Sequence, residues 1–304
     1  MSSPEQPCGF LVLDKPAGLS SHACVARVRR AYGLKRVGHG GTLDPAVTGV
    51  LPIALGPVTR LLPYLGGDKT YRGVVQLGVC TSTDDLEGEL LERRPVPALS
   101  TAQLDAALAP FRGAITQVPP QVSAVHVEGV RAYARVRRGE SLELAARPIT
   151  ISHLELLGWD PASGRLELEL RCSAGTYVRA LARDLGAALG CGGALARLRR
   201  TEALGFTLAQ AVPLEALDAG RQQGGPAPPL LDPLAPLAHL NRHRLSPEEQ
   251  AGWRCGRAPL LPAALAALAP DTPVVVLDPD GNLAGMARAA EGVLQPKLVL
   301  AAAG

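Results

Sequence analysis

The amino-acid sequence predicts a mixed α/β fold of the α+β kind, divided into two domains. Apolar and polar residues alternate over 148–157 and 166–172, as they do in strands that bury one face. Segments with helix-capping residues at their ends are interspersed with such strands. A chain of 304 residues favours two domains over one, and the Pro- and Gly-rich segment 218–236 is where a linker is expected.

The first elements follow from local signals near the N-terminus. Residues 9–14 are a short apolar run that leads into a Lys-Pro-Ala-Gly turn, which is typical of a strand. Ser20 or Ser21 then caps a helix that ends at Gly33. Residues 38–49 are glycine-rich, polar and aperiodic, which indicates a loop.

Strands and helices continue to alternate in the middle of the chain. Residues 70–79 have the composition of a strand, and Ser100 with Gln103 forms a capping box before a helix. After the two alternating strands, a further helix is expected to open at Gly175-Thr176 and to run to about Leu189.

A small β-rich domain is predicted at the C-terminal end. Its short strands are expected at 273–277, 282–287 and 293–300, with a hairpin turn at Asp280-Gly281. The predicted division is therefore a first domain over 1–217, a linker over 218–236 and a second domain over 237–304.

The charge of the chain is small overall but uneven. The formal net charge is +3, which is too weak to indicate a nucleic-acid partner. Residues 1–200 carry a net charge of +6, whereas residues 201–304 carry −3. The basic residues gather in three groups, at 27–36, 131–138 and 197–200. Each group, taken alone, fits a solvated helix face as well as a phosphate-binding patch.

The cysteines and apolar stretches exclude several classes of protein. The six cysteines are scattered, without a Cys-x-x-Cys pair or a histidine at zinc-like spacing, so no metal site is expected. They fit small buried side chains in a reducing cytosol. The apolar stretch 258–270 is too short to span a bilayer, and no secretory leader precedes Gly9. A cytoplasmic protein without membrane contact is expected.

The loop at 38–45 concentrates glycines around His39 and Asp44. Glycine permits tight backbone paths and close approach of a ligand, and Pro45 restricts Asp44 to an extended conformation. An aspartate held on a rigid turn is a candidate nucleophile or base, and a plain turn-forming Asp-Pro is the alternative. A phosphate-binding P-loop is excluded because no Gly-Lys-Ser/Thr follows.

At this loop the sequence resembles a known family. Residues 38–52, GHGGTLDPAVTGVLP, resemble the catalytic motif of TruB-type tRNA pseudouridine-55 synthases. Five more segments resemble family motifs in the same order, namely 11–22, 68–73, 123–139, 172–186 and 195–206. The resemblance implies a catalytic domain on a mixed, mainly antiparallel sheet flanked by helices, with an RNA-gripping insertion at about 120–150. The module at 237–304 is similar to a PUA-type RNA-binding domain.

The resemblance also assigns three catalytic residues. Asp44 matches the nucleophile, and a carboxylate can form a covalent adduct and later leave. Arg179 matches the arginine that pairs with it, because a guanidinium orients a carboxylate through two parallel hydrogen bonds. Tyr71 matches the tyrosine that stacks on the target uracil and is a candidate acceptor of the C5 proton. With an ordinary pKa of about 10, a phenol is a poor base, so stacking is the firmer role.

Four further residues are expected to bind the substrate. Tyr177 and Leu198 match positions that line the uracil pocket, and each could otherwise be plain core. His39 matches the histidine associated with displacement of the substrate base. Lys69 lies two residues before Tyr71 on the same strand and therefore faces the same side, where a structural or electrostatic role is expected.

The activity implied is the isomerisation of a uridine in the T-loop of tRNA to pseudouridine. The base flips out, the glycosidic bond breaks, the uracil rotates and C5 bonds to the ribose. The expected partner is the T-arm stem-loop of tRNA, and no cofactor, metal or guide RNA is expected for a protein acting as a monomer. A guide-RNA-dependent relative and an RNA-folding protein with an idle site remain alternatives. A glycoside hydrolase is excluded because it needs two cooperating carboxylates.

Overall fold

The structure is a computed structural model that describes residues 7–123, 125–127, 129–217 and 227–300. Ten strands of the described residues form one large sheet. They are β1 (Gly9–Lys15), β2 (Val37–His39), β3 (Thr48–Leu55), β4 (Lys69–Leu77), β7 (Gly113–Gln117), β10 (Arg147–Asp160), β11 (Arg165–Cys172), β12 (Gly193–Ala203), β13 (Phe206–Thr207) and β14 (Val212–Pro213).

The strand order in this sheet is β14-β1-β3-β12-β4-β11-β10-β7, with β13 beside β12 and β2 beside β3. The pairs β1–β14 and β3–β12 are parallel, and the other pairs are antiparallel. The mixed, mainly antiparallel sheet implied by the family resemblance is therefore confirmed. Two small ribbons complete the set, β5 (Val79–Thr81) with β6 (Leu90–Arg93) and β8 (His126–Val127) with β9 (Val130–Arg131).

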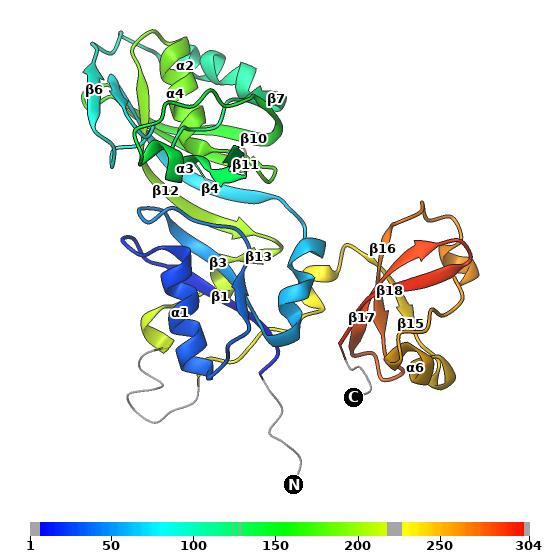
Figure 1. The fold of residues 1–304 in the computed structure, drawn as a ribbon. Coiled ribbons are helices and arrows are strands. Elements are labelled where there is room, and N and C mark those ends of the chain that lie inside the picture. Colours follow the sequence, from blue (N-terminus) through cyan, green and yellow to red (C-terminus); the bar gives the residue numbers. More distant parts are fainter. Residues whose placement is uncertain (1–6, 124, 128, 218–226, 301–304) are drawn as a thin grey trace.

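Three helices pack on one face of the sheet: α1 (Ser21–Tyr32), α2 (Thr101–Leu108) and α4 (Val178–Ala188) (Figure 1). The α1 N-cap is Ser20, whose side chain accepts from the Ala23 backbone N–H, and Gly33 ends the helix with a φ of 65°. The predicted capping box at Ser100 and Gln103 is present. The α4 helix begins at Val178 rather than at Gly175, because residues 173–176 form a turn first.

The predicted strand at 70–79 is interrupted. The β4 strand ends at Leu77, and Gly78 takes a φ of 84° before β5 begins at Val79. A Cβ at Gly78 would lie 2.9 Å from the Arg94 carbonyl oxygen, so this turn needs glycine. Further helical segments of this domain include η1 (Gly56–Tyr64), η2 (Ala109–Phe111), α3 (Ala132–Val136) and η3 (Leu208–Gln210).

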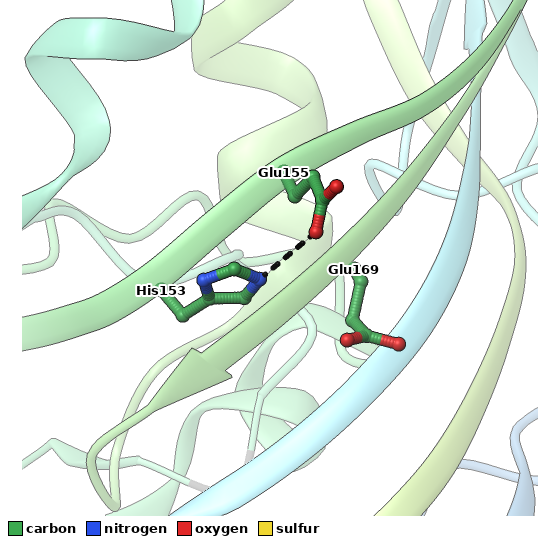
Figure 2. Close-up of side chains that lie close together, drawn as sticks. All are labelled: His153, Glu155 and Glu169. Atoms are coloured by element: carbon green, nitrogen blue, oxygen red, sulfur yellow. Dashed lines mark ion pairs between the residues drawn. The ribbon is translucent and has the colours of Figure 1, made fainter.

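The opposite face of the sheet has two parts. Over β1 and β3 it is apolar, and η1 and the C-terminal domain cover it in one cluster that includes Phe10, Val50, Val275 and Met286. Over β4, β10, β11 and β12 it is charged. Arg72 pairs there with Glu169 at 2.7 Å, and β10 adds His153 and Glu155, 3.3 Å apart (Figure 2).

This charged face changes the interpretation of the basic group at 197–200. Arg199 pairs with Asp14 at 2.7 Å on the charged face, and Arg200 is fully buried in the interior. Adjacent residues of β12 point to opposite sides of the sheet, so the three arginines cannot form one patch. Arg200 is therefore separated from Arg197 and Arg199, which both line the charged face beside Arg72.

The C-terminal domain is a four-stranded sheet, β15 (Asn241–Arg244), β16 (Pro273–Leu277), β17 (Leu283–Ala290) and β18 (Val293–Val299). It stands beside the main body in Figure 1. It also holds η5 (Ala263–Leu265) and α6 (Pro247–Arg254), whose Ser246–Glu249 capping box is a further local signal for a helix. Trp253 of α6 is buried and donates its Nε1–H to the Ala284 carbonyl at 3.1 Å.

The segment predicted as a linker is described only from residue 227 onwards, and 218–226 lie outside the described residues. The described part packs on the main domain. Leu231 exchanges two backbone hydrogen bonds with Phe10, at 3.1 and 2.7 Å, and the short helix η4 (Ala235–Leu237) buries Leu237. A shared apolar cluster therefore joins the two domains.

Candidate active site

The loop between β2 and β3 carries Asp44 and is held from two sides. On one side, the buried Ser21 hydroxyl at the start of α1 accepts from the Leu43 N–H at 2.9 Å and donates to the Leu43 carbonyl at 3.1 Å. Within the loop, the Val47 N–H donates to the Asp44 carbonyl at 3.0 Å. These bonds fix the backbone on both sides of the Asp44 side chain.

On its other side the loop rests on Lys15, which has no exposed surface. The Lys15 ammonium donates to the Pro45 carbonyl at 3.0 Å and to the Pro16 carbonyl at 2.8 Å. Burial lowers the pKa of Lys15, while the nearby Cys24 and Asp44 act in the opposite direction. Lys15 thus shapes the turn beneath the candidate nucleophile.

Gly49 allows β3 to approach β12 beside this loop. It has a φ of 102°, and a Cβ at this position would lie 2.1 Å from the carbonyl oxygen of Arg200. The Arg200 side chain then crosses to the loop, where its Nε donates to the Val50 carbonyl at 2.7 Å and its Nη2 to the Gly41 carbonyl at 3.1 Å. The close strand approach and the buried arginine together anchor both ends of the Asp44 loop.

Arg179 in the first turn of α4 pairs with Asp44. Its Nη2 lies 3.0 Å from Oδ2 of Asp44, and its Nε lies 3.6 Å from Oδ2 of Asp85. Nη1 donates to the Thr83 carbonyl at 2.9 Å, and Nη2 also donates to the Val122 carbonyl at 3.0 Å. Every nitrogen of this guanidinium therefore has an acceptor or an ion-pair partner, which fixes its plane.

The exposure of the pair is unequal. The Arg179 side chain is 9% exposed, whereas the Asp44 side chain is 49% exposed. A buried cation thus holds a carboxylate that remains open to a reactant. This is the arrangement that a carboxylate nucleophile requires, because the attacking oxygen must be oriented but not covered.

A cavity of about 190 Å³ opens in front of Asp44. Six of the seven residues proposed from the sequence line it: Asp44, Lys69, Tyr71, Tyr177, Arg179 and Leu198. They come from the loop before β3, from β4, from the start of α4 and from β12. A larger cleft of about 470 Å³ between the domains has none of these residues in its lining, so the smaller cavity is the candidate active site.

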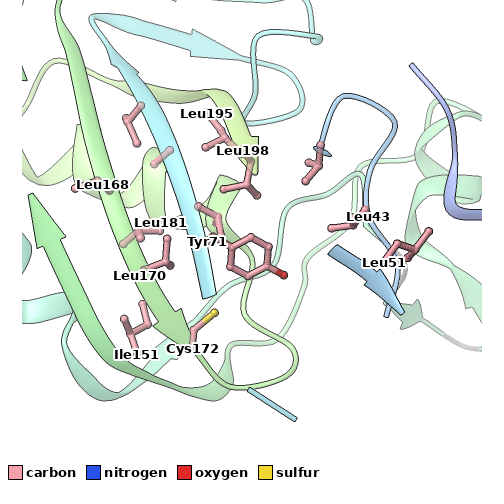
Figure 3. Packing of buried hydrophobic residues seen from close by; sticks show 14 of the residues in the cluster. Leu43, Leu51, Tyr71, Ile151, Leu168, Leu170, Cys172, Leu181, Leu195 and Leu198 are labelled. Atoms are coloured by element: carbon pink, nitrogen blue, oxygen red, sulfur yellow. The ribbon is translucent and has the colours of Figure 1, made fainter. Parts of the chain in front are cut away.

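Tyr71 is buried in the wall of this cavity. Figure 3 shows it among Leu170, Cys172 and Leu198 of the core cluster. Burial raises the pKa of Tyr71, and the nearby Arg200 guanidinium acts in the opposite direction. The side chain is therefore a neutral phenol at neutral pH, which fits a stacking surface or a hydrogen-bond donor better than a base.

His39 is the seventh residue and does not line the cavity. It lies on β2, where its ring meets the ring of His22 edge to face with the centroids 5.4 Å apart. Its Nδ1 is buried without a hydrogen-bond partner, and burial lowers the pKa of the imidazole, with His22 and Arg200 adding to the effect. His39 is thus a mostly neutral ring beside the loop rather than in the pocket.

Sequence reasoning misses two residues of this site. Asp85 follows a turn in which Asp84 has a φ of 61°, and the pattern Thr-Ser-Thr-Asp-Asp contains no signal that it faces Arg179. Arg200 lies in a basic group with its sequence neighbours, and this group gives no sign that Arg200 is buried at the site. The alternation of side chains along a strand could have shown that Arg200 and Arg199 point to opposite faces of the sheet.

Other functional classes find little support in the described residues. One group there has metal-ligand spacing, namely His153, Glu155 and Glu169. It lies on the charged face of the sheet, away from the cavity, and Glu169 is already paired with Arg72. Over the same residues, no helix has both the length and the apolar character needed to cross a membrane.

Comparison with known proteins gives a consistent result. The model of the TruB family pseudouridylate synthase N-terminal domain matches residues 29–178, and that of the tRNA pseudouridylate synthase B C-terminal domain matches 179–240. The chain is 61% identical over 299 residues to tRNA pseudouridine synthase B of Parasynechococcus marenigrum strain WH8102, covering 98% of this chain and 99% of that protein. It is 62% identical to the protein of the same name from Synechococcus sp. strain WH7803, with the same coverage of both.

A solved structure shares the fold at much lower sequence identity. It is described as an H/ACA RNP bound to a substrate RNA containing 2'-deoxyuridine, with a TM-score of 0.71 and 21% identity. The match covers 96% of this chain and 84% of that one.

Proposed function

Because the chain belongs to the TruB family of pseudouridylate synthases, we propose that it isomerises a uridine in the T-loop of tRNA to pseudouridine. The observation that carries the proposal is the half-exposed Asp44 carboxylate, paired with the buried Arg179 at the mouth of a cavity lined by Tyr71. Such a cavity must receive a base that has left its stack, and flipping costs a few kcal/mol. The planar His39 beside the loop is suited to fill the space left in the RNA.

In this proposal the flipped uracil stacks on Tyr71, and Leu198 and Tyr177 bound it. Asp44, oriented by Arg179, is the nucleophile: its carboxylate forms a covalent bond to the substrate as the bond between N1 and C1′ breaks, and that covalent bond breaks again when C5 bonds to C1′. The uracil then rotates within the cavity, C5 bonds to C1′ and the C5 proton leaves to a base. Lys69 supplies positive charge beside the rotating ring, and burial lowers its pKa.

We also propose that the chain needs no guide RNA and acts as a single copy in the cytoplasm, where tRNA matures. The relatives that it matches over 98% of its length are named tRNA pseudouridine synthase B, whereas its likeness to the H/ACA protein, at 21% identity, concerns the fold. The exposed arginines of the insertion and the PUA-like C-terminal domain are proposed to contact the tRNA.

The test is to incubate the purified protein with an unmodified tRNA transcript and no guide RNA, and to map pseudouridine by chemical modification and primer extension. Product at one T-loop uridine is expected, and none from Asp44→Asn, which should bind tRNA within about tenfold of the wild type, or roughly 1.4 kcal/mol. A wild-type protein that binds the transcript without forming pseudouridine would instead support the RNA-folding alternative. Product that appears only with a guide RNA would support the guided alternative.

A further inference from the structure

We infer that Gln117 is a positioning residue that connects the insertion to the catalytic side chains on α4, an inference that rests on the proposed function. Gln117 is the last residue of β7, at the point where the chain leaves the large sheet. Its side chain is buried, although it carries a polar amide. A buried amide needs hydrogen-bond partners, and the identity of those partners shows what it holds in place.

Both ends of the Gln117 amide bind the backbone of a single residue. Its Nε2 donates to the Tyr177 carbonyl at 3.1 Å, and its Oε1 accepts from the Tyr177 N–H at 2.9 Å. The side chain thereby reproduces the paired hydrogen bonds that a neighbouring strand would make. Such a bidentate contact fixes both the position and the direction of the Tyr177 backbone.

The Tyr177 backbone sets the geometry of the active site. Tyr177 is the N-cap residue of α4, and its side chain makes no capping hydrogen bond. Its ring lines the cavity, and Arg179 follows two residues later in the first helical turn. A small rotation at Tyr177 would therefore move the ring and the Arg179 guanidinium relative to Asp44.

The residues directly after Gln117 continue the connection. The Val118 carbonyl accepts from Nη2 of Arg183 at 2.8 Å, and the Val122 carbonyl accepts from Nη2 of Arg179 at 3.0 Å. Three contacts thus bind the start of the insertion to α4. We call residues 117–122, which make these contacts, the α4 contact segment. The same insertion carries exposed arginines at 131, 137 and 138.

These contacts indicate that two parts of the insertion have different roles. Under the proposed function its arginines bind RNA phosphates, while the α4 contact segment holds Tyr177 and Arg179 at the cavity. Loss of the Gln117 amide should therefore slow the chemical step more than it weakens tRNA binding. A residue that merely stabilised the fold would not separate these two quantities.

The decisive variant is Gln117→Glu, which keeps the volume but sets a carboxylate oxygen against the Tyr177 carbonyl. At pH 7.5 and saturating tRNA, the single-turnover rate should fall at least 30-fold, with the tRNA dissociation constant within threefold of the wild type. Protonation of the introduced carboxyl restores a donor toward that carbonyl. The rate relative to the wild type should therefore rise as the pH falls from 8 to 6.

Two further variants make the test specific. Gln117→Met removes both hydrogen bonds to Tyr177. Its single-turnover rate should fall about as much as that of Gln117→Glu at pH 7.5, but the loss should not depend on pH. If Gln117→Glu does not fold, Gln117→Met alone tests the inference. Gln103→Glu is the matched control, because glutamate serves equally well in the α2 capping box, and wild-type rates are expected. A Gln117→Met protein with a wild-type rate would overturn the inference, as would parallel losses of rate and binding.

Hydrogen exchange separates this inference from the proposed function. The Tyr177 amide should exchange at least tenfold faster in Gln117→Met than in the wild type, whether or not the protein forms pseudouridine. An inactive wild type with this difference would refute the proposed function and leave the structural connection standing. Equal exchange in an active protein would refute the connection alone.

Discussion

The guanidinium of Arg179 lies 3.0 Å from the carboxylate of Asp44, with the cation buried and the carboxylate half exposed. This relationship explains why an open loop and an interior helix end cooperate at one cavity. The helix supplies a fixed charge, and the loop supplies the reactive oxygen.

Arg179→Lys should abolish most of the activity. An ammonium group cannot replace the planar fork that contacts Asp44, Asp85 and two backbone carbonyls at once. We expect the single-turnover rate to fall by at least about 100-fold, or roughly 2.7 kcal/mol in the barrier, with tRNA affinity within about threefold. The control is Arg72→Lys, on the charged face of the sheet, which should stay within about twofold. A similar loss in both variants would contradict the assigned role.

Asp85→Asn should lower the rate by about tenfold, or 1.4 kcal/mol. The substitution keeps the shape but removes the negative charge that lies 3.6 Å from Nε of Arg179. Asp84→Asn is the matched neighbour, since asparagine tolerates the left-handed backbone there and the partner of Asp84 is Arg183. Rates measured on tritiated tRNA should rank wild type, then Asp84→Asn, then Asp85→Asn, and the reverse order of the two variants would refute the prediction.

Gly49→Ala should destabilise the protein by more than about 2 kcal/mol, because positive φ and a backbone clash add together. The new Cβ would meet the Arg200 carbonyl at 2.1 Å, and that carbonyl belongs to a paired strand that cannot easily shift. Gly33→Ala is the control, since its φ is also positive but nothing lies within 4 Å. Urea unfolding should show the larger loss for Gly49→Ala, and equal losses would mean that the strands can separate there.

His39 should make the stability of the protein sensitive to acid. Its pKa is lowered by burial, so below the ordinary value of 6.5 the unfolded chain binds a proton that the folded protein does not. The free energy of unfolding therefore falls as the pH drops through this range. Between pH 7.5 and 5, His39→Phe should lose less stability than the wild type, whereas His126→Phe, at an exposed site, should follow the wild type. Parallel curves for all three proteins would refute the prediction.

The exposed arginines of the insertion should contribute to the salt dependence of tRNA binding. Removing one phosphate-binding cation reduces the slope of log affinity against log salt by about 0.7 to 0.9. The double variant Arg131→Gln/Arg138→Gln should therefore lower the slope by about 1.5 without changing the rate at saturating tRNA. Arg165→Gln, at the start of β11, should leave the slope unchanged. An unaltered slope in the double variant would remove these arginines from the interface.

Much of the fold could be predicted because its signals are local. Ser20 and Gly33 delimit α1, the Ser100–Gln103 box opens α2, and alternation marks β10 and β11. The predicted start of α4 is too early because a Gly-Thr turn and a helical first turn have similar sequence signals. The contact of residues 227–237 with β1 has no local signal in the sequence, because the residues that it meets, such as Phe10, lie far away along the chain.

By itself, the sequence determined the family, the Asp44 loop and the residue types that the chemistry needs. The tertiary structure decided which of those residues meet, through contacts between positions far apart in the chain. Gln117 reaches Tyr177 across 60 residues, Arg179 reaches Thr83 across 96, and Arg200 reaches Val50 across 150. Strand order and register create these neighbours, and one step of register exchanges the buried and exposed faces of a strand. That is why Arg200 lies under the active-site loop while Arg199, one residue earlier, pairs with Asp14 on the opposite face.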